Sequence, residues 1–367
     1  MMTKIQISRT QYFLILPNLL FAKAIGITAG VTARKVGGDT WTAMTVGFVV
    51  GILIIMIMTY LNSKFPEHTV IKLSETLLGK WIGIFIGIIL TLFFAVAFAA
   101  SANVMTMHLK EYFLLETPFW LICLVYILLC MYGVFLGIEN IIRFSLIGFL
   151  GILLTNISMI FGTINDFEFI NVLPLFDRGF AASITNSIYI FSDLAMAILA
   201  VGMIYPMVDK KEHIASITFW AMIISMLLIL IWPLFELGVM GAGAMKQYVV
   251  VCMQQVRCAQ LTRYFPRYEL IMVSFFTFCT FVQSATMFYC SVYSFKQVTG
   301  IKKDWYIVLP FTAVLFLMTY FMAHDHNDYI RFLTYPWAHI CAALSIGLPL
   351  VLLAVALVKK KAGNVQN

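Results

Sequence analysis

Residues 18–39 read NLLFAKAIGITAGVTARKVGGD, and this stretch decides how the chain folds. An apolar run long enough for a membrane-spanning helix carries a lysine, Lys23, and then passes into Gly, Ala and Thr. Glycine weakens a helix, and an ammonium group is costly inside a bilayer, so neither suits an ordinary lipid-facing helix. The pattern predicts a first span, at about residues 10–35, that is interrupted near the middle of the membrane.

The composition of the whole chain supports a membrane environment. Hydrophobic residues make up 62% of the 367 residues, charged residues make up 11%, and the mean hydropathy is +0.95. Soluble domains are roughly half apolar and a quarter charged. Lys4 and Arg9 lead directly into a full-length span, so no cleaved signal peptide is expected. We therefore predict an all-α polytopic membrane protein with a single transmembrane domain over residues 1–367.

Membrane-length apolar runs between charged or Gly/Pro-rich breaks predict ten spans in total. After the first, their approximate limits are 41–62, 81–108, 118–136, 141–163, 180–207 (interrupted), 214–238, 268–295, 304–323 and 331–358. Two loops are long enough to hold structure. Residues 63–80 are expected to form a short amphipathic helix at the inner surface, and residues 239–267 form a candidate lid or partner surface.

The sixth span repeats the pattern of the first. It reads ITNSIYIFSDLAMAILAVGMIYP and carries one intramembrane charge, Asp193, among small and hydroxylated neighbours. The two interrupted spans begin about half the chain apart, and each is the first of five. This is the pattern of an inverted five-plus-five repeat whose first helices are broken at the midplane. The repeats would cover about residues 10–163 and 180–358, with the breaks lining a binding site.

The distribution of Lys and Arg predicts the orientation. With the N-terminus inside, fourteen of the 24 basic residues fall on the inner side and nine on the outer side, the remaining one being Lys23. The positive-inside rule therefore places both termini in the cytoplasm. The formal charge of +7 is explained by topology and by contacts with lipid headgroups, and it requires no nucleic acid.

Several short motifs occur in an order that resembles one known family. They are GKWIG at 79–83, FLLETP at 113–118, GIENIIRF at 137–144, N-x-L-P at 171–174 and PRYE at 266–269. Together with the ten-span layout, they resemble the B subunits of spore germinant receptors, a branch of the amino acid/polyamine/organocation (APC) permease superfamily. The resemblance covers residues 5 to 357 and rests on the order of the motifs, since no single motif is specific.

This resemblance implies an APC/LeuT-like fold with broken helices 1 and 6. It also implies a subunit of the spore inner membrane that senses a small germinant, such as an amino acid, and triggers germination. The expected partners are a larger A-type membrane subunit and a C-type lipoprotein. Neither a cofactor nor enzymatic chemistry is expected.

The chain departs from the family pattern at both breaks. Members typically carry Gly-x-Gly followed by Leu-Pro in the first helix, whereas this chain has AKAIG at 22–26 with no proline after it. A Glu is common in the later part of the sixth helix, but here the only acid of that span is Asp193. Two alternatives remain open: recognition of a different ligand, or loss of ligand binding.

The candidate ligand-binding residues at the breaks are Lys23, Ala24, Gly26 and Asp193. The ammonium group of Lys23 is expected to face the cavity and to pair with Asp193 or with a ligand carboxylate. The alternative is that Lys23 snorkels toward the membrane interface. An unpaired carboxylate at mid-span costs a few kcal/mol, so Asp193 is expected to have a partner or to be protonated.

The third and eighth spans supply further candidates. Ser101 and Asn103 lie in a run of small residues, and Gln283 and Met287 are one turn apart on a common helical face. In the superfamily that the chain resembles, the eighth helix faces the broken first helix. Close helix packing is the alternative explanation for both groups.

The sequence HDHND at 324–328 contains metal-ligand residue types, but it falls in a short outer loop where such residues are ordinarily solvated. No metal site is predicted there. Three functions remain open: a receptor subunit, a proton- or sodium-coupled amino acid permease, and a membrane scaffold whose cavity is vestigial.

Overall fold

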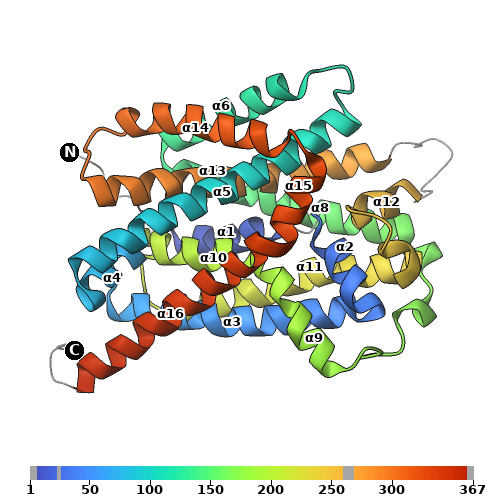
Figure 1. Cartoon of the computed structure of the whole chain (residues 1–367), viewed down its shortest axis with the longest axis horizontal. Coiled ribbons are helices and arrows are strands. Elements are labelled where there is room, and N and C mark those ends of the chain that lie inside the picture. Colours follow the sequence, from blue (N-terminus) through green and yellow to red (C-terminus); the bar gives the residue numbers. More distant parts are fainter. Residues whose placement is uncertain (1–5, 23–25, 259–267, 362–367) are drawn as a thin grey trace.

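The computed structural model describes residues 6–22, 26–258 and 268–361, and within these ranges the regular structure is helical. A single isolated bridge, between Ile7 and Val208, is the one β-type contact in this part of the chain. Nine helices in the described ranges are long and apolar enough to cross a membrane. Figure 1 shows the long helices packed side by side in one bundle. The prediction of a polytopic all-α membrane protein is confirmed.

Seven of the predicted spans correspond to essentially continuous helices. They are α3 (Thr40–Lys64), α5 (Lys80–Tyr112), α6 (Phe119–Leu136), α8 (Ser145–Thr163), α11 (Ile214–Met245), α13 (Tyr268–Thr299) and α14 (Trp305–Met322). A short helix, α7 (Ile138–Arg143), precedes α8. The helix α11 contains one kink, at Gly241, whose φ of 73° is a conformation that glycine adopts readily.

The first and sixth spans are interrupted, as predicted. The first consists of α1 (Arg9–Phe21) and α2 (Thr28–Val36), and each half is too short to cross a membrane alone. The sixth consists of α9 (Phe180–Asn186), the 3₁₀ segment η4 (Ser187–Ile190) and α10 (Phe191–Ile204).

The tenth span, predicted at 331–358, lies in one helical stretch over Asn327–Lys359 that contains a π-helical segment, which the sequence pattern did not predict. It consists of α15 (His326–Phe332), a π-helical segment, η6 (Leu333–Trp337), and α16 (Ala338–Lys361). Pro336 lies inside the π-helical segment. Proline has no N–H group and clashes with the preceding turn of an α-helix, so it favours such a local change of winding.

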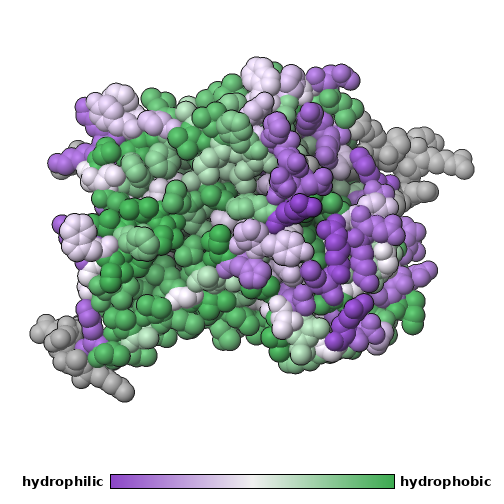
Figure 2. All heavy atoms as spheres, viewed as in Figure 1, coloured by the Kyte–Doolittle hydropathy of each residue, from purple (hydrophilic) through white to green (hydrophobic). Residues whose placement is uncertain are grey.

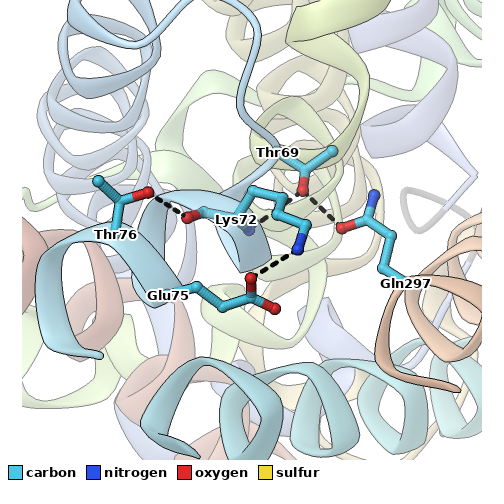
Figure 3. A network of polar contacts seen from close by, with 5 residues as sticks. All are labelled: Thr69, Lys72, Glu75, Thr76 and Gln297. Atoms are coloured by element: carbon cyan, nitrogen blue, oxygen red, sulfur yellow. Dashed lines mark hydrogen bonds and ion pairs between the residues drawn. The ribbon is translucent and has the colours of Figure 1, made fainter. Parts of the chain in front are cut away.

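The predicted amphipathic helix in the 63–80 loop is α4 (Val70–Leu78). Thr69 caps its start by accepting a hydrogen bond from the backbone N–H of Lys72. The Thr69 hydroxyl also donates to Gln297 Oε1 at 2.7 Å, which joins α4 to the end of α13 (Figure 3). An ion pair of 2.6 Å between Lys72 and Glu75 lies on the same helix.

Polar contacts join the start of α1 to the link between α10 and α11. Arg9 forms an ion pair of 2.9 Å with Glu212, and the backbone N–H of Ile7 donates to the carbonyl of Met207. Lys211 of the same link forms an ion pair of 2.7 Å with Glu67. The start of the first span is therefore connected to the end of the sixth.

The surface divides into an apolar belt and polar ends. Figure 2 shows hydrophobic residues over the middle and left of the bundle, a thin polar rim at the left and a broader polar region at the right. This right-hand end carries α12 (Val251–Cys258) in Figure 1. Such a belt is what a helix bundle presents to lipid.

Candidate functional site

A small cavity lies where the interrupted spans meet. The space that a water molecule can enter is about 30 Å³. Its walls come from α2, α5, the η4–α10 junction and the π-helical segment η6. The lining residues are Gly26, Ile27, Thr28, Val31, Val104, Tyr189, Ser192, Asp193, Leu333, Thr334 and Trp337.

Asp193 supplies the carboxylate of this cavity. Its side chain is 5% exposed and lies in the first turn of α10. One carboxylate oxygen accepts a hydrogen bond of 2.8 Å from the hydroxyl of Thr28, and the other accepts one of 3.0 Å from Ser192. The partial positive charge at the start of a helix also favours a carboxylate there. Thr28 begins α2, so this bond joins the two broken spans at their breaks.

Thr28 and Asp193 also border a second, smaller space. It has a volume of about 10 Å³ and is lined mainly by apolar side chains, among them Leu20, Trp232 and Pro233. The hydrogen-bonded pair therefore takes part in the walls of both spaces. Movement of α2 relative to α10 would change both at once.

The main cavity is too small for an organic ligand in this conformation. About 30 Å³ holds roughly two water molecules. Pockets for small ligands measure about 300–1,000 Å³. A ligand of amino acid size therefore requires the walls of the cavity to move apart.

The predicted site residues fall into three groups. Gly26 and Asp193 line the cavity. Lys23 and Ala24 lie outside the described residues, so the pairing of Lys23 with Asp193 stays a prediction. The remaining four, from the third and eighth spans, do not belong to the lining of this cavity.

Ser101 and Gln283 contact each other instead. The Ser101 hydroxyl donates a hydrogen bond of 2.9 Å to Gln283 Oε1, and Gln283 Nε2 donates to the backbone carbonyl of Leu19. These bonds join α5, α13 and α1. Asn103 and Met287 are fully buried, and neither polar atom of the Asn103 amide has a hydrogen-bond partner among the described residues. A ligand-binding role for these four residues stays a prediction.

The sequence reasoning missed the contribution of the tenth span. Leu333, Thr334 and Trp337 form one wall of the cavity. The ring of Trp337 stacks on Phe93 of α5, with ring centroids 5.3 Å apart. Pro336 in the stretch LTYPW was only a weak signal, because Pro233 and Pro310 lie inside the α-helices of other spans.

The polar loop at 324–328 has a structural role in the described chain. Asp325 caps α15 by accepting hydrogen bonds from the backbone N–H groups of Asn327 and Asp328, at 2.8 and 3.1 Å. These bonds hold the pKa of Asp325 below its usual range. The described residues contain no group of three His, Cys, Asp or Glu side chains that could hold a metal ion.

Comparison with protein families and curated proteins gives consistent matches. A family model described as "Spore germination protein" matches residues 6–328. Spore germination protein A2 of Bacillus subtilis is 21% identical over 98% of both chains. Spore germination protein GerQB of Bacillus cereus is 21% identical over 83% of this chain and 86% of its own. YndE of Bacillus subtilis is 26% identical, but that match spans about half of each chain.

Solved structures share the fold of this chain. MhsT in complex with L-phenylalanine has a TM-score of 0.69 at 12% identity, over 97% of this chain and 99% of its own. A mutant of the Eremococcus coleocola manganese transporter has a TM-score of 0.60 at 12% identity, over 94% and 78%. At such low identity the likeness shows the fold alone, and that fold is the LeuT-like arrangement that the family resemblance implied.

Proposed function

Because this chain belongs to the spore germination protein family, we propose that it is the membrane subunit of a germinant receptor. In this role it senses a small molecule, in the first instance an amino acid, and triggers germination from the spore inner membrane. The observation that carries the proposal is the Asp193 carboxylate, held by Thr28 of the other broken span at the cavity where the two breaks meet.

The lining of the cavity suits a ligand with an ammonium group. A carboxylate at low dielectric attracts a cation strongly, and the aromatic side chains of Tyr189 and Trp337 offer further favourable contacts to a cation. Val31 and Val104 give the cavity an apolar side. An amino acid with a small apolar side chain combines these two features.

The small volume of the cavity supports sensing through a change of conformation. A ligand enters only when α2, α10 and η6 separate, so its binding free energy favours the open arrangement over the closed one. The partners that receive this change are an A-type membrane subunit and a C-type lipoprotein. The names of the relatives GerQB and A2 are in keeping with a multi-subunit receptor family.

Thermal-shift measurements on the purified protein test the proposal. Amino acids, nucleosides and sugars are added separately, and we expect stabilisation by an amino acid. Asp193→Asn removes the charge and should abolish this shift, whereas Asp209→Asn, an exposed acid after α10, should leave it unchanged. A shift that survives Asp193→Asn would place the ligand elsewhere, and stabilisation by none of the compounds would contradict ligand sensing by this chain.

Uptake measurements separate a receptor from an amino acid permease. Vesicles containing only this chain are given the labelled ligand with a proton or sodium gradient. We expect binding without accumulation. Concentrative uptake would replace the receptor proposal with the coupled permease.

A further inference from the structure

A second buried carboxyl group lies in α11, away from the cavity lining. Glu236 is 1% exposed, and its Oε2 atom has no hydrogen-bond partner among the described residues. No ion pair of the described chain includes it. An isolated carboxylate inside a span is costly, and in proteins such groups are paired, coordinated or neutral.

The helix α12 packs against α11. Cys252 is close enough to Glu236 for burial and the negative charge of Glu236 together to raise the pKa of its thiol. The thiol therefore supplies no positive charge. Arg257, the basic residue of α12, lies over the ring of Tyr112 instead, at 4.9 Å from its centroid.

Gln255 of α12 is fully buried and only partly satisfied. Its Nε2 atom donates to Thr163 Oγ1 at 3.3 Å and lies 3.7 Å from the sulfur of Met159. Its Oε1 atom has no partner among the described residues. Cys252 and Gln255 are three residues apart on the helix, so they share one face.

Asn156 of α8 adds a third buried oxygen atom without a hydrogen-bond partner among the described residues. Its Nδ2 atom donates to the carbonyl of Ile152 at 3.0 Å, whereas Oδ1 has no partner within the described chain. Asn156, Met159 and Thr163 follow one another at spacings of three and four residues, so they lie on one face of α8. Gln255 contacts this face, and α8, α11 and α12 all pack against one another.

We propose that Glu236, Gln255 and Asn156 bind a monovalent metal cation, Na⁺ or K⁺, between α8, α11 and α12. Carboxylate and amide oxygens are the ligands that hard cations prefer. One carboxylate balances one positive charge, so the buried site is neutral with a monovalent ion. A divalent ion would ordinarily take more than one carboxylate.

Protonation of Glu236 alone satisfies these oxygens less well. A protonated carboxyl group has one O–H donor, so it can serve only one of the other two oxygens. A single cation can be coordinated by all three oxygen atoms together. Because α12 contributes one ligand, the bound ion would also hold α12 against α8 and α11.

Binding is tested on the purified full-length protein in lipid nanodiscs. Melting temperature is measured in chloride salts of Na⁺, K⁺ and N-methyl-D-glucamine at constant ionic strength and pH, and radiolabelled Na⁺ binding is measured directly. We expect a saturable rise in melting temperature with Na⁺ or K⁺ and none with N-methyl-D-glucamine. Glu236→Gln should abolish this rise, and Gln255→Met should weaken apparent affinity by about tenfold or more.

Two controls locate the effect. Glu116→Gln changes an exposed acid and should keep the wild-type response. Asp193→Asn should also keep it, because Asp193 borders the other cavity. Loss of the response in Asp193→Asn would overturn the assignment by placing the ion there.

Further results would also overturn the proposal. These are equal melting temperatures in all three salts, a full response in Glu236→Gln, or a stabilisation that follows pH but not the cation. Gln255→Met and Asn156→Leu retain the carboxyl group, so they test the site even if Glu236→Gln does not fold. A full response in both of these variants would contradict the proposed ligands.

Discussion

The hydrogen bond between Thr28 and Asp193 offers the most direct test of how the two broken spans are held together. Thr28→Val removes the hydroxyl group and keeps a β-branched side chain of nearly the same size. The lost bond is 2.8 Å long, it is buried, and its acceptor is a carboxyl group. Hydrogen bonds to charged groups contribute about 1.5–3 kcal/mol. We expect the free energy of unfolding to fall by that amount.

Thr32→Val is the matched control for this change. Thr32 is also buried in α2, one turn further along, and its hydroxyl donates to the backbone carbonyl of Thr28 in the same helix. Such bonds within one helix contribute little to stability. The two variants therefore change the same residue type in the same helix, but only Thr28→Val removes a contact between the broken spans.

Thermal unfolding in detergent, followed by tryptophan fluorescence, measures the difference. Domains of 150–250 residues lose about 2–4 °C per kcal/mol, so we expect Thr28→Val to melt several degrees below the wild type and below Thr32→Val. Equal melting temperatures for the two variants would refute the reasoning, because the contact between the spans would then contribute no more than a bond within one helix.

Three other predictions concern charge and orientation. A reporter fused after Lys361 should be cytoplasmic, and an external reporter would contradict the ten-span topology. Lys23→Met alone should reduce expression and germination more than Lys23→Met combined with Asp193→Asn, since the single change leaves one buried carboxylate without its predicted partner; a silent Lys23→Met would instead favour snorkelling. The pKa of Asp325 is lowered in the folded protein, so the charged carboxylate stabilises the fold at pH values above the ordinary aspartate pKa of about 4. This contribution is lost as the pH falls through the lowered pKa of the folded state. Melting temperatures from pH 6 down to about pH 3 should therefore fall less for Asp325→Asn than for the wild type, and parallel curves would contradict the cap.

Local features of the sequence were sufficient to predict a bundle of membrane-spanning helices and two of its broken spans. Apolar runs of membrane length predicted the bundle, because in a bilayer each span satisfies its own backbone hydrogen bonds. The breaks at the first and sixth spans were also readable, since glycine, small residues and a buried charge weaken a helix wherever they occur. The π-helical segment of the tenth span contains Pro336, but proline alone did not predict it, because Pro233 and Pro310 lie inside α-helices.

The candidate site was only partly predictable. Gly26 and Asp193 line the cavity, because residues next to a break in a helix lie at the space that the break leaves. For Ser101 and Gln283 the sequence predicted polar residues inside the bundle but not their contacts. These two residues are 182 positions apart in the sequence, and they form a hydrogen bond with each other instead of facing the cavity.

What the sequence determined by itself was therefore the number, length and interruption of the spans, because those properties depend on neighbours along the chain. The tertiary structure alone decided which faces meet. Lipid and neighbouring helices are both apolar, so the hydrophobicity of a span carries little information about which side faces which. Only packing placed Trp337 at the cavity and Glu236 against the helix that carries Cys252 and Gln255. A site made by three or four spans becomes visible only when those spans are packed together.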